Sequence, residues 1–147
     1  MTKTQWLLSL SIAAACAAPL PALADDHPYA EGEVVNIARI RTTNGHFEDY
    51  MQFLATTWKA YQEAALKAGY ITGYRVLVVE ARGENDPDIL LEVRYKNWAA
   101  LDNSTAKGDE IAKKVEGSVM ASNESYGARD KIRRTLGSMT TQVLTLK

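Results

Sequence analysis

The chain has 147 residues, of which 46% are hydrophobic and 24% are charged, and its formal net charge is −1. That length corresponds to one domain. The near-neutral charge excludes a protein that binds nucleic acid over its whole surface, because such binding requires a strongly basic face.

Residues 1–24 differ from the rest of the chain. Lys3 is their only charge, residues 6–18 are apolar, and the segment ends in Ala22-Leu23-Ala24. This pattern predicts a secretory signal peptide that is cleaved after Ala24, and hence a periplasmic or secreted protein. The apolar run is shorter than the ~20 residues that a helix needs to cross a bilayer, so we expect no stable membrane insertion.

Cys16 lies inside the apolar run, which raises the alternative of a lipoprotein anchored at that residue. The preceding Ala13-Ala14-Ala15 lacks the leucine that lipoprotein signals usually carry, so ordinary cleavage is favoured. Cleavage would remove the only cysteine. The mature protein would then have no disulfide, no thiol nucleophile and no cysteine-ligated metal.

The first half of the domain predicts a strand and a long helix. Residues 25–32 are polar and predict a flexible leader, and the domain is expected to span residues 33–147. Residues 33–43 are rich in β-branched side chains and predict the first strand. Residues 45–68 predict a helix that ends at Gly69. Its apolar face comprises Phe47, Tyr50, Met51, Leu54, Trp58, Tyr61, Ala65 and Ala68.

The second half predicts three strands and one more helix. Residues 70–82 and 88–96 predict two strands joined by a turn at 83–87. Asn97 can cap a short helical segment that holds Trp98 and Leu101. Residues 109–121 predict the second main helix, weakened by Gly117. Residues 122–134 fit either a helical turn or a loop, and residues 135–147 predict the last strand.

The predicted order is β-α-β-β-α-β with a hairpin in the middle. This is the ferredoxin-like arrangement of the α+β class. Its strand order is 4-1-3-2, in one antiparallel sheet with both helices on the same face. The other face of the sheet is left bare, so it must be covered or unusually polar.

The long first helix with Trp58 and Tyr61, followed by GYITGYRVLVV and LEVRYKNWAALD, resembles the dimeric α+β barrel superfamily. Within it, the chain is similar to small exported bacterial proteins without an assigned activity. The resemblance covers residues 33–147 and implies a homodimer whose two bare sheet faces pack against each other. The superfamily includes cofactor-independent monooxygenases, haem-degrading and peroxidase-type haem proteins, lactone isomerases and stress-response proteins, so fold alone does not decide function.

The sequence offers few residues that could bind a haem or a metal ion. The two histidines are His27, in the leader, and His46, at the start of the first helix. A haem ligand normally projects from a buried element beside an apolar pocket, so His46 is expected at the surface. The resembling haem peroxidases carry their ligand late in the chain, where this sequence has no histidine. We therefore expect neither haem nor zinc, and no cofactor.

Two sets of residues are candidates for a ligand site. Trp58 and Tyr61 could form an aromatic pocket wall, although their place on the apolar stripe favours core packing. Asn97 and Trp98 follow the third strand and are further candidates if the protein is an enzyme. No Ser-His-Asp set, phosphate-cradling glycine loop or paired-carboxylate signature is recognisable.

The third strand carries two charges. Ile89, Leu91, Val93 and Tyr95 alternate with Leu90, Glu92, Arg94 and Lys96, so Glu92 and Arg94 are expected on the bare face. If Arg39 or Arg41 of the first strand faces Glu92, the simplest result is a cross-strand ion pair that fixes register. The phase of the first strand is open, because Val34, Asn36, Ala38 and Ile40 could take that face instead. The alternative is that spare guanidinium groups among Arg39, Arg75 and Arg94 bind a carboxylate or another planar anion.

A basic cluster near the end of the chain comprises Arg129, Lys131, Arg133 and Arg134. Short mixed charge runs are usually solvated, so we expect a surface helical turn, with the rim of an anion site as the alternative.

Three functions remain open on this basis. The favoured one is an exported homodimer that binds a small anionic or aromatic ligand. The second is a cofactor-independent monooxygenase or isomerase, and the third is a non-catalytic envelope or stress protein whose product is the dimer itself.

Overall fold

Four strands form the sheet of this protein, whose computed structural model describes residues 27–147. They are β1 (Tyr29–Thr42), β2 (Gly73–Val78), β3 (Ile89–Tyr95) and β4 (Arg133–Leu146). All neighbours are antiparallel and the order is β2-β3-β1-β4, which confirms the predicted topology. β1 begins earlier than predicted, inside the expected leader, because Tyr29 pairs with Leu146 of β4.

The helix predicted over residues 45–68 contains a π-helical turn in its middle. α1 (Phe47–Phe53) and α2 (Lys59–Lys67) are joined without a break by a π-helical turn, η1 (Leu54–Trp58). The Thr56 hydroxyl donates to the carbonyl of Gln52 at 2.8 Å, a side-chain to backbone bond that competes with helical hydrogen bonds. The wider turn accommodates one extra residue, so the residues after it are rotated by about 100° relative to a continuous α-helix.

The second helical region differs from the prediction. The 3-10 turn η2 (Trp98–Leu101) is capped as expected, and α3 (Ser104–Glu116) follows it. The helix predicted over residues 109–121 is wrong at its end, because Gly117 adopts a left-handed conformation (φ +81°) and terminates α3. A separate helix, α4 (Val119–Ala128), and a 3-10 turn, η3 (Arg129–Lys131), then lead into β4.

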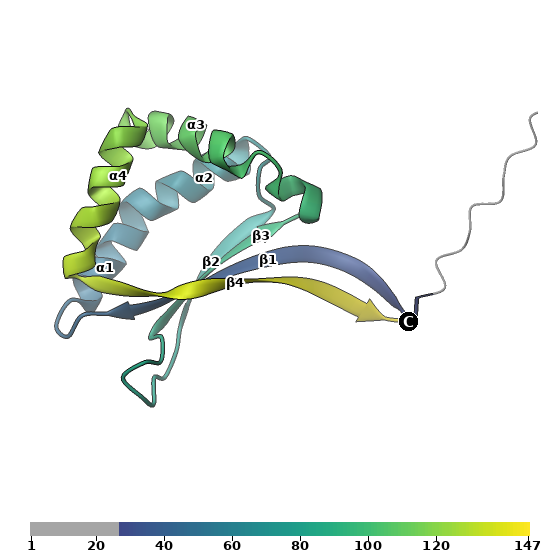
Figure 1. The fold of residues 1–147 in the computed structure, drawn as a ribbon, viewed down its shortest axis with the longest axis horizontal. Coiled ribbons are helices and arrows are strands. Elements are labelled where there is room, and N and C mark those ends of the chain that lie inside the picture. The colour runs from purple at the N-terminus through teal and green to yellow at the C-terminus, as the bar shows by residue number, and fades with distance from the viewer. Residues whose placement is uncertain (1–26) are drawn as a thin grey trace, which may run out of the picture.

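All four α-helices lie on one face of the sheet (Figure 1). The buried core on that face consists of Ile40, Tyr50, Leu54, Ile89 and Leu91. Since Ile40 pairs with Ile89 across the strands, the even-numbered residues of β1 from Val34 onward face the helices. The open phase of the first strand is thereby settled. The opposite surface, here called the bare face, carries Val35, Ile37 and Arg39 of β1 with Leu90, Glu92 and Arg94 of β3.

The outer ends of β1 and β4 form a two-stranded ribbon that extends past the rest of the sheet (Figure 1). β3 pairs with β1 only from Val34 onward, whereas β4 pairs with β1 from Tyr29. Leu146 at the tip is 81% exposed. Within the described residues, no helix has the length and apolar character needed to span a bilayer.

Candidate functional site

A cavity of about 360 Å³ lies between the helices and the sheet, and we call it the helix–sheet cavity. One part of its wall is aromatic and the other part is polar. The aromatic side chains are Tyr50, Phe53, Trp58, Tyr61 and Tyr126. The polar ones include Glu116, Ser122, Asn123, Arg129 and Arg133. The volume is at the lower end of the ~300–1,000 Å³ range of small-molecule sites.

Trp58 contributes to the core as well as to the cavity wall. Its ring meets that of Tyr74 of β2 edge to face, with centroids 5.3 Å apart and planes at 82°. It is also one of the half-buried side chains that pack on the core of Ile40, Leu54 and their neighbours. The two roles predicted as alternatives for Trp58 are therefore both present in one side chain.

Two arginines place positive charge in this aromatic site. The guanidinium carbon of Arg129 lies 4.1 Å from the ring centroid of Phe53, and that of Arg133 lies 4.5 Å from the ring centroid of Tyr126. Arg133 is only 5% exposed and donates to Asp130 at 2.6 Å. Burial, followed by repulsion from Arg133, lowers the pKa of Arg129. The cavity therefore offers cationic groups where solvent screening is reduced.

The hydroxyl end of Tyr61 forms the polar corner of the cavity. It donates to the Ser122 hydroxyl at 2.7 Å. Burial raises the pKa of Tyr61, the Ser122 hydrogen bond opposes this shift, and the nearby Glu116 carboxylate adds to it. Oε2 of Glu116 is buried and has no hydrogen-bond partner among the described residues. Because such an atom is costly to leave unpaired, it is a ready acceptor for a hydroxyl or amide of a ligand.

A smaller cavity of about 200 Å³ adjoins the first, and Tyr61 and Gln62 line both. Lys107 lines the smaller cavity, donates to the carbonyl of Ala100 at 2.8 Å and lies 5.6 Å above the ring of Tyr70. The cavities thus follow the helical layer from α4 to the start of α3.

Asn97 and Trp98, the other aromatic-site candidates, lie outside both cavities. Oδ1 of Asn97 accepts a hydrogen bond from the backbone N–H of Ala100 at 3.1 Å, which makes it the N-cap of η2. The indole of Trp98 donates to Gln142 at 3.0 Å, and the residue is 48% exposed. These contacts give both residues structural roles at the end of β3.

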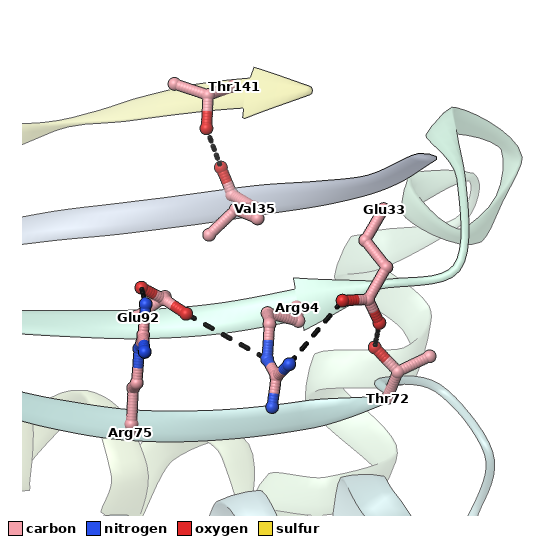
Figure 2. Close-up of polar contacts among 7 residues, drawn as sticks. All are labelled: Glu33, Val35, Thr72, Arg75, Glu92, Arg94 and Thr141. Carbon is pink, nitrogen blue, oxygen red and sulfur yellow. Dashed lines mark hydrogen bonds and ion pairs between the residues drawn. The ribbon is translucent and has the colours of Figure 1, made fainter. Parts of the chain in front are cut away.

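The predicted charged residues meet on the bare face, on the other side of the sheet (Figure 2). Arg75 of β2 lies directly across from Glu92 and donates to it at 2.7 Å. Nε of Arg94 is 3.9 Å from the second oxygen of Glu92, and its Nη1 is 3.5 Å from Glu33. Thr72 donates to the other oxygen of Glu33 at 2.6 Å. We call Thr72, Glu33, Arg94, Glu92 and Arg75 the bare-face network.

The condition for an ion pair of Glu92 with Arg39 or Arg41 is not met. Ile37, not an arginine, lies opposite Glu92 on β1, and Arg39 lies opposite Leu90. The hairpin between β2 and β3 instead sets a register that brings Arg75 to Glu92. The ion-pair interpretation thus applies to Arg75, Glu92 and Arg94, whereas Arg39 forms no ion pair with any residue in the described part of the chain.

The sheet therefore separates the sequence-predicted residues into two groups. Trp58 and Tyr61 line the helix–sheet cavity, and Arg39, Arg75, Glu92 and Arg94 lie behind it on the bare face. The expected surface turn is present as η3 and carries Arg129, but the expectation of solvation is wrong for Arg133, which is buried, and both arginines line the cavity. Tyr50 and Glu116 were missed as site residues. The position of Tyr50 on the predicted apolar stripe was the available signal, and Glu116 had none.

Metal ligands do not gather at either site. Across residues 27–147, no three His, Cys, Asp or Glu side chains lie together in a way that could hold a metal ion. His46, at the start of α1, bonds Asp49 of the same turn at 2.7 Å and does not line the helix–sheet cavity.

The known proteins that resemble this chain were found by their structure and not by their sequence. No protein-family model matches the sequence, and no curated protein matches it. A dimeric ferredoxin-like protein from an uncultured marine organism is similar with a TM-score of 0.51 and 12% identity, over 80% of this chain and 98% of that one. Protein SO0527 from Shewanella oneidensis is similar with a TM-score of 0.50 and 14% identity, over the same shares of each chain. The β-α-β-β-α-β order, the antiparallel sheet and these structures together show that the chain has the ferredoxin-like α+β fold.

Proposed function

We propose that this protein is an exported homodimer that binds a small aromatic ligand with an anionic group in the helix–sheet cavity. The observation that carries the proposal is the combination of aromatic walls with the guanidinium groups of Arg129 and Arg133. Aromatic rings offer apolar area and stacking geometry, and an arginine fork recognises a carboxylate bidentately. The unpaired Glu116 oxygen favours a ligand that also carries a hydroxyl or N–H donor.

The homodimer is supported by the character of the bare face. Ile37 and Leu90 are half-buried there, Met139 opposite Ile37 is 47% exposed, and no helix covers them. A second copy packed on this face would bury these apolar side chains together with the bare-face network, whose charges are already paired. The similar marine protein is described as dimeric. Export rests on the signal-peptide pattern of residues 1–24, which lie outside the described residues.

Thermal unfolding in the presence of aromatic acids tests ligand binding. We expect an aromatic acid that fits to raise the melting temperature of the wild-type protein, and its neutral amide analogue to raise it less. Arg129→Gln should lose most of the response to the acid. Lys131→Gln removes an exposed cation of η3 that does not line the cavity, so it should respond like the wild type. Equal responses to acid and amide, or none to any aromatic acid, would contradict the proposal.

A second candidate is a cofactor-independent monooxygenase or isomerase, and the Glu116 carboxylate near the Tyr61 hydroxyl favours it. A phenol and a carboxylate at the polar corner of an aromatic cavity can move a proton to or from a bound substrate. Oxygen uptake with hydroquinone substrates, and isomerisation of unsaturated lactones, would detect these reactions. Tyr61→Phe should then lower turnover while leaving ligand binding largely intact. An unchanged rate in this variant would remove Tyr61 from the reaction.

A further inference from the structure

Two arginines face each other at the end of the sheet where β1 stops and β4 starts. Arg41 of β1 is the direct cross-strand partner of Arg134 of β4. Arg41 follows Arg39 by two residues, so the strand alternation places all three arginines on the bare face. Like charges directly opposite each other in a sheet are destabilising, so this arrangement calls for a compensating negative charge.

Within residues 27–147, no carboxylate forms an ion pair with either arginine. Arg41 donates only to the carbonyl of Asp86 at 3.4 Å, and Arg134 only to the Glu84 carbonyl and the Asn85 amide oxygen at 3.4 and 3.3 Å. These contacts are long and their acceptors are neutral.

Two carboxylates close to these arginines in the sequence pairing, those of Asp86 and Asp88, accept hydrogen bonds from the backbone. Asp86 accepts hydrogen bonds from the N–H groups of Arg82 and Gly83, at 3.1 and 2.8 Å. Asp88 accepts from the N–H group of Thr42 at 3.0 and 3.1 Å and also from its hydroxyl. Asp86 thus holds the turn between β2 and β3, and Asp88 holds the end of β1, so both carboxylates are engaged by backbone N–H groups.

A polar groove of about 550 Å³ lies over this position, and we call it the arginine groove. Arg41, Arg82 and Arg134 line it, together with Thr43 and Asn44. Glu84 is the one acid among its lining residues in the described chain. Three guanidinium groups against one carboxylate leave the groove with a positive excess, and the planar fork of arginine suits the oxygens of a phosphate.

We propose that the arginine groove binds a small phosphate-type oxyanion, either as the free ion or as the phosphoryl group of a small metabolite. The anion bridges Arg41 and Arg134 and so relieves their mutual repulsion. This site is independent of the ligand proposed for the helix–sheet cavity, because the two cavities share no lining residue.

Thermal unfolding with about 10 mM inorganic phosphate, at an ionic strength matched with sodium chloride, tests this site. For millimolar affinity we expect the wild-type melting temperature to rise by about 4 °C, and that of Arg134→Gln by less than about 1 °C. Without phosphate, Arg134→Gln should melt at or above the wild-type temperature, because it removes a repulsion. Should this variant not fold, Arg41→Gln carries the same expectation.

Two further variants sharpen the test. Glu84→Gln removes the competing carboxylate and should increase the phosphate response. Lys131→Gln removes an exposed cation that does not line the groove and should respond like the wild type. Phenyl phosphate and glycerol phosphate, compared with inorganic phosphate, show whether the free ion or a phosphoryl group binds more tightly.

Three results would overturn the proposal. No response to any phosphate would show that the groove does not bind the anion. An equal response in the wild type and in Arg134→Gln would show binding elsewhere. A loss of dimer by light scattering in Arg134→Gln, with no phosphate effect in the wild type, would show that a carboxylate of a second copy fills the groove.

Discussion

Glu92 is the most buried carboxylate in the described chain, with 4% of its surface exposed. Its charge is balanced by Arg75, whose side chain is 59% exposed, and by Arg94, which is 41% exposed. These two ion pairs therefore lie at the boundary between protein and solvent, where screening by water limits their strength. Its main effect is to hold β2 and β3 in one register, because Arg75 and Glu92 are direct cross-strand partners.

Glu92→Gln should lower the free energy of unfolding by about 1–2 kcal/mol, since it leaves Arg75 without a counter-charge and Arg94 with Glu33 alone. Urea unfolding measures this loss. Glu110→Gln is the matched control, because Glu110 pairs with Lys114 at 2.6 Å on an exposed helical surface. Its unfolding midpoint should stay within error of the wild type. Equal effects of the two substitutions would contradict a special role for Glu92.

The buried Tyr50 makes the free energy of unfolding depend on pH in the alkaline range. Burial raises the pKa of Tyr50 above its usual value of 10.0, against the opposing charges of Arg133 and Arg129. Below pH 10 the hydroxyl is neutral in both folded and unfolded chains, so the contribution to stability is complete. As the pH rises through 10, the unfolded chain ionises first, and stability falls until the folded pKa is passed.

Tyr50→Phe should therefore reduce the loss of stability above pH 10, which urea unfolding across alkaline pH measures. The loss should shrink without vanishing, because burial also raises the pKa of Tyr61 and Tyr95. Stability curves that run parallel in the variant and the wild type would contradict this role for Tyr50.

At the scale of elements, the boundary between α3 and α4 depends on Gly117. Its φ of +81° lies in the region that side chains with a Cβ adopt only with strain. Gly117→Ala should therefore lower the free energy of unfolding by about 1 kcal/mol, even though nothing lies within 4 Å of the added methyl group.

Gly108 is the matched control, because it lies inside α3 and a methyl group there also meets open space. Gly108→Ala should raise the free energy of unfolding by about 0.5–1 kcal/mol, since alanine favours the helix and restricts the unfolded chain. Thermal unfolding of the two variants should thus shift in opposite directions. Shifts of the same sign would show that φ at residue 117 does not control this boundary.

The strands also show which features of the fold the sequence patterns could predict and which they could not. Alternation along β3 predicted which face carries Glu92 and Arg94, because a strand has a fixed period of two. The partner of Glu92 was not predictable in the same way, since register depends on the conformation of the turn between β2 and β3. Arg133 was misjudged because its burial follows from pairing with Thr42, a contact between distant segments.

At the scale of the whole molecule, the bare face explains why we expect two copies. Met139→Glu should convert the dimer to a monomer, because it places an unpaired carboxylate in the proposed seam. Light scattering across a dilution series measures this change. Met120→Glu is the control, because Met120 is 72% exposed on α4, away from the sheet. A wild-type monomer at micromolar concentration would contradict the dimer.

β4 also has a consequence for handling the protein. It lies at the edge of the sheet, and no residue from Thr135 to Leu146 is charged. Edge strands with unpaired backbone groups and no gatekeeping charge are templates for adding further chains. The bulge near Gly137 interrupts this template close to its start, which leaves the ribbon half of β4 as the open part. We therefore expect concentrated samples to lose solubility by strand-to-strand growth from that end, and a single lysine on the ribbon to slow it.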